Sequence, residues 1–146
     1  MSNRIAAVTL LVLSCGCSPR SSGQQSVVLP VHQHGTTVWT TEPWTPTAAE
    51  LAELESRITD VSKLKPDEPR DTRSITSPEK YFRQYLPYMH AGKKWVSINA
   101  FCRVPTYTDW HQTYVSVVDG GDCYWKALYD PVTHQFSNLR INGLGG

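Results

Sequence analysis

The clearest periodic pattern in the chain lies between residues 47 and 62, where apolar side chains recur at every third or fourth position. Charged residues fill the positions between them, as on a helix that buries one stripe. The stripe consists of Ala48, Leu51, Leu54, Ile58 and Val61. Residues 47–50 (Thr-Ala-Ala-Glu) have the spacing of a capping box, and Thr45 with Pro46 offers an alternative start. The pattern predicts one amphipathic helix that ends near Ser62.

A second pattern begins at residue 81, where large apolar residues alternate with polar ones over short segments. Alternation with a period of two is typical of strands that bury one face. Residues 90–93 (His-Ala-Gly-Lys), 119–122 (Asp-Gly-Gly-Asp) and 130–131 (Asp-Pro) have the composition of turns. The predicted strands are 81–89, 95–102, 114–118, 123–129 and 136–142.

Three details refine this sheet. Pro87 marks the first segment as an edge strand, because proline has no N–H to donate to a ladder. The apolar phase slips between Phe136 and Leu139, which predicts a bulge. Residues 27–31 could add a further edge strand, although Pro30 excludes a central position.

A single helix laid across the apolar face of the sheet is the economical way to bury both. The sequence therefore predicts an α+β fold, with one N-terminal amphipathic helix on a four- to five-stranded, mainly antiparallel sheet. The order of the elements is cystatin-like. This domain is assigned to residues 46–146.

Composition narrows the classes of partner. The 14 basic and 13 acidic residues leave a net charge of +1 and form no basic block, so nucleic acid is not an expected partner. The sequence contains no phosphate-binding loop and no metal-ligand set, and no cofactor is expected. His32 and His34 share one face of an extended segment, but no third ligand accompanies them at useful spacing.

The first 14 residues have the organisation of a signal peptide, with Arg4 before an apolar run from Ile5 to Leu13. The run fits the roughly 7–15 residues of a signal-peptide core and falls short of the about 20 that a membrane-spanning helix needs. Residues 14–17 (Ser-Cys-Gly-Cys) then resemble the lipobox of bacterial lipoproteins. The resemblance implies cleavage before a lipid-carrying cysteine, Cys15 or alternatively Cys17, and we expect a flexible tether to follow it as far as residue 45.

The lipobox resemblance also implies a location. Diacylglycerol and a further acyl chain such as palmitate would anchor the mature protein in a membrane of the bacterial cell envelope, facing the periplasm or the exterior. Several acyl chains on one residue give stable anchoring, whereas one chain alone is marginal. A simply secreted protein is the alternative.

Cys102 and Cys123 lie in the predicted sheet, and an exported protein meets an oxidising compartment in which a disulfide persists. Closing their loop of about 20 residues corresponds to roughly 3 kcal/mol of stabilisation. In a plain meander, however, the two residues would lie two strands apart, beyond the Cα separation of about 7 Å that a disulfide tolerates. Either the 103–112 loop crosses the sheet and brings the cysteines together, or both thiols are free.

The predicted domain carries five motifs: 44–47 (Trp-Thr-Pro-Thr), 81–85 (Tyr-Phe-Arg-Gln-Tyr), 95–102 (Trp-Val-Ser-Ile-Asn-Ala-Phe-Cys), 119–125 (Asp-Gly-Gly-Asp-Cys-Tyr-Trp) and 142–143 (Asn-Gly). Together they resemble an uncharacterised family of small bacterial secreted proteins and lipoproteins. The resemblance runs from Trp44 to the end of the chain. It implies an extracytoplasmic location and a single fold, and it implies no mechanism.

The long loop at 103–112 is the expected place for function, because binding and catalytic residues concentrate on loops that a scaffold positions. For a hydrolase it offers Asp109 and His111, a carboxylate beside an imidazole, and Asp119 and Asp122 follow. No nucleophile stands in a recognisable motif, so we predict no catalytic residue. A binding or accessory module with an envelope protein as partner is the preferred interpretation, and a small extracytoplasmic hydrolase is the alternative.

The predicted binding surface combines this loop with aromatic residues on the outward face of the sheet. It consists of Trp95, Phe101, Asp109, Trp110, His111 and Tyr124. A cystatin-type protease inhibitor would instead need a Gln-x-Val-x-Gly hairpin, which residues 114–118 (Tyr-Val-Ser-Val-Val) do not supply.

Overall fold

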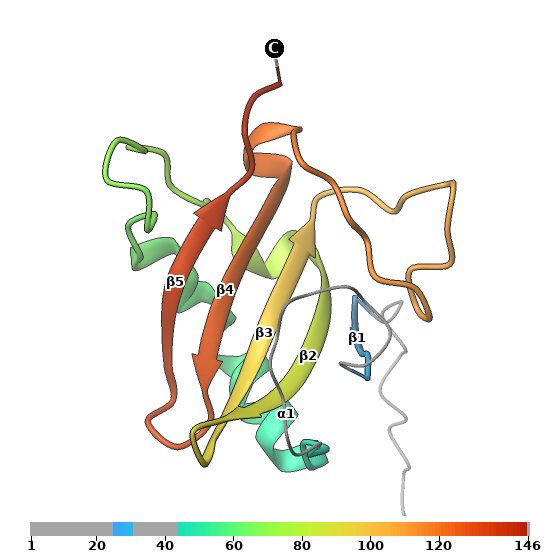
Figure 1. Cartoon of the computed structure of the whole chain (residues 1–146), viewed down its shortest axis with the longest axis vertical. Helices are drawn as coiled ribbons and strands as arrows, with labels where there is room; N and C mark the ends of the chain where they lie inside the picture. The colour runs from blue at the N-terminus through green and yellow to red at the C-terminus, as the bar shows by residue number, and fades with distance from the viewer. Residues whose placement is uncertain (1–24, 31–43, 146) are drawn as a thin grey trace, which may run out of the picture.

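The structure is a computed structural model that describes residues 25–30 and 44–145. The fold is α+β, and its five-stranded mixed sheet has the order β1-β2-β3-β4-β5. The first pair of strands is parallel and the other three are antiparallel. Figure 1 shows the helices as a layer behind the sheet and a long loop that leaves the end of β3. The elements are β1 (Ser26–Val28), α1 (Ala48–Ser56), η2 (Ile58–Lys63), η3 (Pro78–Lys80), β2 (Phe82–His90), β3 (Lys93–Phe101), η4 (Gly121–Cys123), β4 (Tyr124–Asp130) and β5 (Gln135–Ile141).

Several predictions fall on residues outside the described ranges. They are the signal peptide at 1–14, the lipidated Cys15 or Cys17, and the pair His32 and His34. Within the described ranges, no helix has the length and apolar character needed to cross a membrane.

The predicted helix begins where its cap places it. Glu50 N donates to Thr47 Oγ1 at 3.2 Å and Thr47 N donates to Glu50 Oε2 at 2.7 Å, which completes the capping box. The backbone N–H of Thr47 holds the pKa of Glu50 below its ordinary value. The α-helix ends at Ser56, earlier than expected, and a 3₁₀ helix (η2) continues the apolar stripe.

The helical layer buries that stripe against one face of the sheet. Leu54, Ile58 and Val61 are each at most 3% exposed. Their sheet partners are Tyr85, Val96, Ile98, Ala100, Trp125, Ala127, Tyr129, Phe136 and Leu139. Because fully burying one large apolar side chain contributes about 1.5–3 kcal/mol, this face holds the helical layer and the sheet together.

Local turn chemistry sets the register of the sheet. The hairpin between β2 and β3 has a two-residue loop in which Ala91 (φ 49°) and Gly92 (φ 73°) both adopt positive φ, as a twisted hairpin requires. In β5, Asn138 (φ 53°) and Leu139 fall between the residues paired with Leu128 and Lys126. This irregularity confirms the predicted bulge.

The prediction that residues 81–89 form an edge strand is wrong for the first half of β2. Ser26–Val28 pair in parallel with Arg83–Tyr85, and Leu29 N donates to Tyr85 O at 2.8 Å. The pairing with β1 stops before Pro87, which has no backbone N–H to donate to a neighbouring strand. Ser26–Val28 therefore form an edge strand, as predicted for residues 27–31, and are not part of a flexible tether; Leu29, directly after the strand, is 2% exposed.

The predicted strand at 114–118 is also wrong. These residues form no strand, so β3 and β4 are neighbours in the sheet. The stretch Asp119–Asp122 consequently does not join two strands as a hairpin turn. It leads into β4 through the short helix η4.

Candidate functional site

A long loop closed by a disulfide is the most distinctive feature of the structure. We call residues 103–122 the disulfide loop. Cys102 follows the last residue of β3 and Cys123 precedes the first residue of β4, and these two strand ends, Phe101 and Tyr124, are directly paired. The cysteines are therefore neighbours, with a Cα–Cα distance of 4.9 Å, and Cys102 N donates to Cys123 O at 2.9 Å. The disulfide is confirmed, and the separation expected from a plain meander is wrong.

The length of the disulfide loop argues for a role. Loops longer than about 12–15 residues inside compact domains are uncommon and are usually functional or disordered. Apart from the short helix η4, this loop has no regular structure. What holds it on the sheet therefore decides between these two cases.

Two buried amide side chains bind the loop to the sheet. Gln84 on β2 donates from Nε2 to Trp110 O at 2.7 Å and to Thr113 O at 2.8 Å. Its Oε1 accepts from Val115 N and from Asn99 Nδ2, both at 2.9 Å. Asn99 on β3 also donates to Val115 O at 2.9 Å. Both donors and both acceptor positions of the Gln84 amide are filled, so the network is satisfied rather than strained.

An apolar cluster on the same face adds to this attachment. Trp110 is 5% exposed, and its ring lies edge-on to Phe82 and Phe101, with centroids 5.6 Å from each. Val115 belongs to the same buried group, and Val27 of β1 packs against it. The loop thus has its own small core, separate from the one beneath the helices.

The end of the loop that leads into β4 is fixed by close packing. Gly120 has φ +90°, and a Cβ there would lie 2.7 Å from the ring of Tyr124. Asn142 Nδ2 donates to Val117 O at 2.6 Å and to Asp119 O at 3.1 Å, which joins the loop to the segment after β5. The loop is therefore held at both ends and in its middle.

The outer side of the loop is exposed. Tyr107 is 69% exposed and Val104 is 43% exposed. Asp109 Oδ1 accepts from His111 N at 3.0 Å and lies 3.2 Å from His111 Nδ1, and both side chains are about half exposed. The imidazole also stacks on the Trp110 ring, with centroids 4.1 Å apart. This side offers two apolar side chains and one carboxylate–imidazole pair to a partner.

The structure divides the predicted binding surface. Asp109 and His111 are exposed together, whereas Phe101 (0% exposed) and Trp110 (5%) are buried, so the expectation that they form exposed aromatic surface is wrong. Phe101 does lie on the face away from the helices, but the loop covers that face. Tyr124 is half-buried beside Phe101. Trp95 is opposite Tyr88, near the far end of β3, and is not part of this site.

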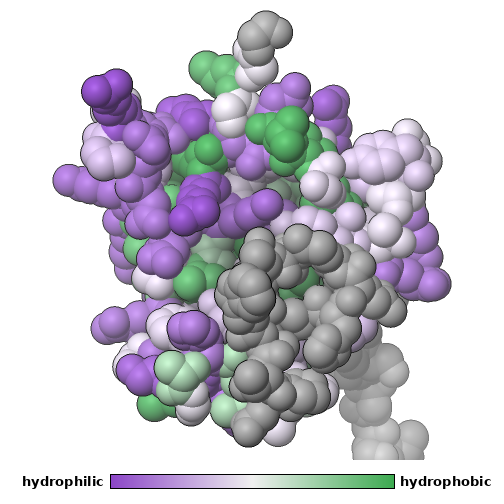
Figure 2. Space-filling model, viewed as in Figure 1, coloured by the Kyte–Doolittle hydropathy of each residue, from purple (hydrophilic) through white to green (hydrophobic). Residues whose placement is uncertain are grey.

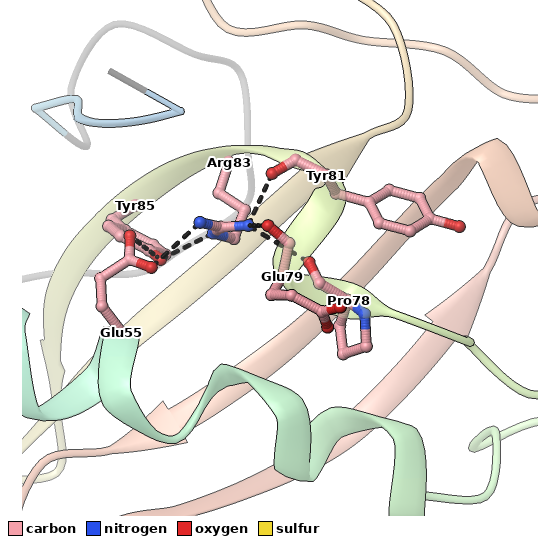
Figure 3. Close-up of polar contacts among 6 residues, drawn as sticks. All are labelled: Glu55, Pro78, Glu79, Tyr81, Arg83 and Tyr85. Atoms are coloured by element: carbon pink, nitrogen blue, oxygen red, sulfur yellow. Dashed lines mark hydrogen bonds and ion pairs between the residues drawn. The ribbon is translucent and has the colours of Figure 1, made fainter. Parts of the chain in front are cut away.

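A second polar cluster lies beneath β2, and sequence reasoning missed it (Figure 3). The Arg83 guanidinium donates to Glu55 Oε2 at 3.0 Å and to Tyr85 Oη at 3.1 Å, and Tyr85 Oη donates to Glu55 Oε1 at 2.7 Å. Burial, together with the nearby Glu55 carboxylate, raises the pKa of Tyr85 far above its ordinary value. Further acceptors of the guanidinium are the carbonyls of Pro78, Glu79 and Tyr81. The cluster is internally satisfied and joins α1, η3 and β2, so its role is structural.

An open groove of about 850 Å³ lies between the segment 66–73 and the end of β5. Arg73 pairs with Asp71 at 2.6 Å, and its guanidinium donates to Asn142 O at 2.8 Å and Ile141 O at 3.4 Å. The bond from Arg73 holds the pKa of Asp71 below its ordinary value. The guanidinium thus binds backbone carbonyls at the end of β5. Because Asp67 N also donates to Leu139 O at 2.7 Å, the contacts of this segment are explained by its covering the outer edge of the sheet.

No metal centre is formed by the residues that the structure describes, because no three His, Cys, Asp or Glu side chains gather there. Comparison with protein-family models, with curated proteins and with solved structures found no match. The disulfide loop therefore remains the candidate site on geometry alone.

Proposed function

We propose that this protein is a lipid-anchored binding module of the bacterial cell envelope and that the outer side of the disulfide loop is its binding surface. The lipobox at residues 14–17 supports the anchor. The disulfide is consistent with a location outside the cytoplasm, where such bonds persist. The resemblance to small secreted proteins and lipoproteins supports the same location.

One observation carries the binding role: the loop is fixed from its inner side while its outer side is exposed. Gln84 and Asn99 hold the backbone at residues 110–115, and the disulfide closes the base. A surface that is already ordered loses less conformational entropy when a partner binds, so more of its contact energy becomes affinity. Tyr107 supplies the large, stiff amphipathic side chain that such contacts favour.

The anchor is tested by metabolic labelling with radioactive palmitate. Wild-type protein should incorporate label and fractionate with membranes. Cys15→Ala should abolish both, and Cys17→Ala should change neither. The reverse result would move the anchor to Cys17, and wild-type protein without label would contradict the proposal.

The binding surface is tested by photo-crosslinking in intact envelopes. A photoreactive phenylalanine analogue replaces Tyr107 in one variant and Val132 in another. Val132 is 76% exposed but lies in the β4–β5 turn, at the opposite end of the sheet, and is the matched control. Position 107 should yield an adduct with an envelope component, and position 132 should not. Equal yields, or none at position 107, would contradict the proposed surface.

A hydrolase is the second candidate, and the contact between Asp109 and His111 is the observation that favours it. A carboxylate-paired imidazole can act as a general base toward water. In this case Asp109→Asn and His111→Gln would each remove a hydrolytic activity of the purified protein. A binding module would show no hydrolytic activity to lose.

A further inference from the structure

Exposed apolar side chains gather at one end of the molecule. The described residues leave five large hydrophobic side chains exposed, and four of them lie in the disulfide loop, which leaves the sheet at the end of β3, or in the segment after β5. These four, which we call the apolar end, are Val104, Tyr107, Val118 and Leu144, with exposures of 43%, 69%, 88% and 80%. Figure 2 shows strongly hydrophobic surface at this end, beside the C-terminus. The fifth, Val132, lies at the other end of the sheet.

Ordered backbone presents the apolar end. The bonds from Asn142 fix the backbone on both sides of Val118, and Gly121 N donates to Gly143 O at 2.8 Å, directly before Leu144. A Cβ at Gly121 would lie 3.0 Å from Leu144 Cδ2, so this side chain sits close over the loop. Val118 and Leu144 are therefore features of a fixed surface, and Tyr107 lies three residues before the buried Trp110.

The chain enters the domain at this same end. Because β1 is parallel to β2, it begins where β2 begins, and Arg83 N donates to Gln25 O at 2.8 Å. Arg83 is paired with Ala100, two residues before Cys102. Residue 25 thus lies beside the base of the disulfide loop. Figure 1 shows β1 on the side of the sheet from which this loop projects.

The length of chain before this entry point limits the distance from a lipid anchor. About ten residues separate Cys15 from Gln25, which gives a mean span of roughly 17 Å as a random coil and at most about 36 Å fully extended. The hairpin of β2 and β3 carries the molecule a further nine residues away from this end, or roughly 30 Å. At its mean span this segment is shorter than the hairpin, so an anchor at Cys15 favours orientations in which the apolar end is closer to the membrane than the β2–β3 turn.

We propose that the apolar end docks on the surface of the bilayer that holds the anchor, so that the partner of the disulfide loop is lipid. This inference rests on the proposed lipid anchor and adds the partner and the orientation. Tyrosine and aliphatic side chains on a fixed surface suit the interfacial zone of a membrane, where apolar burial and a polar hydroxyl are both accommodated.

The charges at this end specify the kind of lipid. In the disulfide loop Asp109, Asp119 and Asp122 outnumber Arg103. The groove that Leu144 lines adds three carboxylates (Asp67, Glu68, Asp71) and three guanidiniums (Arg70, Arg73, Arg140), so the net charge at this end stays negative and anionic headgroups would repel the surface. Docking therefore depends on apolar contact, and it should be stronger on zwitterionic than on anionic vesicles.

The test uses the full lipidated protein in vesicles of phosphatidylethanolamine and phosphatidylcholine, with hydroxyl-radical footprinting read by mass spectrometry. The reference is the unlipidated double variant Cys15→Ala/Cys17→Ala in solution. Oxidation of Tyr107 and Leu144 should fall by about fivefold or more in the vesicles, because these side chains leave water on docking. Oxidation of Val132 should not change. The double variant Val118→Ser/Leu144→Ser should lose most of the protection at Tyr107, and Val132→Ser should keep it.

Three other outcomes would contradict the inference, and each identifies which part of it fails. If the protein is lipidated but Tyr107 and Leu144 are oxidised as strongly in vesicles as in solution, docking is overturned and the anchor stays intact. Protection at Tyr107 that occurs in native envelopes but not in protein-free vesicles would replace lipid with a protein partner. If the mass of the intact protein shows no attached lipid, both the anchor and the docking are overturned.

Discussion

The buried Gln84 side chain offers the sharpest test of how the loop is held. Gln84→Met keeps the size and flexibility of the side chain but removes the four hydrogen bonds of its amide. Val115 N and Trp110 O would then lie buried without a partner, whereas Thr113 is exposed and its carbonyl can bind water. An unsatisfied buried polar group costs roughly 1–3 kcal/mol, so the loss of unfolding free energy should be about 3–4 kcal/mol.

Urea denaturation with the disulfide intact measures this loss, and Gln135→Met is the matched control. Gln135 is exposed on β5, and its substitution should change the unfolding free energy by less than about 0.5 kcal/mol. Amide hydrogen exchange of Val115 should also accelerate in Gln84→Met, because its N–H loses its acceptor. A loss below about 1 kcal/mol together with unchanged exchange would refute the account of the loop.

Three further predictions concern the frame around the site. Cys102→Ser/Cys123→Ser should lower the unfolding free energy by about 3 kcal/mol in urea titrations, because the disulfide closes a loop of about 20 residues; no loss would contradict the entropic argument. Ala91→Gly should raise the free energy of unfolding by about 0.5–1 kcal/mol in thermal denaturation, since Ala91 adopts φ 49°. A lower free energy of unfolding would show that this φ does not strain Ala91. Glu50→Gln should destabilise the protein at neutral pH but not near pH 3. The lowered pKa of Glu50 means that its stabilisation is present above the unfolded value of 4.5 and is lost as the pH falls through the folded value. A difference from wild type that is the same at both pH values would exclude the capping carboxylate as the cause.

The parts of the fold that local rules determine could be predicted from the sequence. The capping box at Thr47, the buried stripe at Leu54, Ile58 and Val61, and the bulge near Asn138 each depend on residues a few positions apart. The same local periodicity does not distinguish an α-helix from the 3₁₀ turn that carries Ile58 and Val61.

The parts that depend on distant side chains could not be predicted. Residues 114–118 alternate as a strand does, and Val115 is indeed buried, but the amides of Gln84 and Asn99 take the place of a neighbouring strand. Phe101 points away from the helices as expected, yet Trp110 from the loop covers it. Polar residues of a strand that bind a loop backbone leave no periodic signal, so the sequence did not show that Phe101 and Trp110 are buried.

The proposed function requires that the disulfide loop is an ordered surface rather than a mobile connection. Backbone order parameters from NMR relaxation measure this property most directly for the amides of residues 109–115. We expect values near the roughly 0.85 of rigid backbone, similar to those of β3 and β4. Values below about 0.6 for these residues would contradict it, because a loop that moves on this timescale is not held by Gln84 and Asn99.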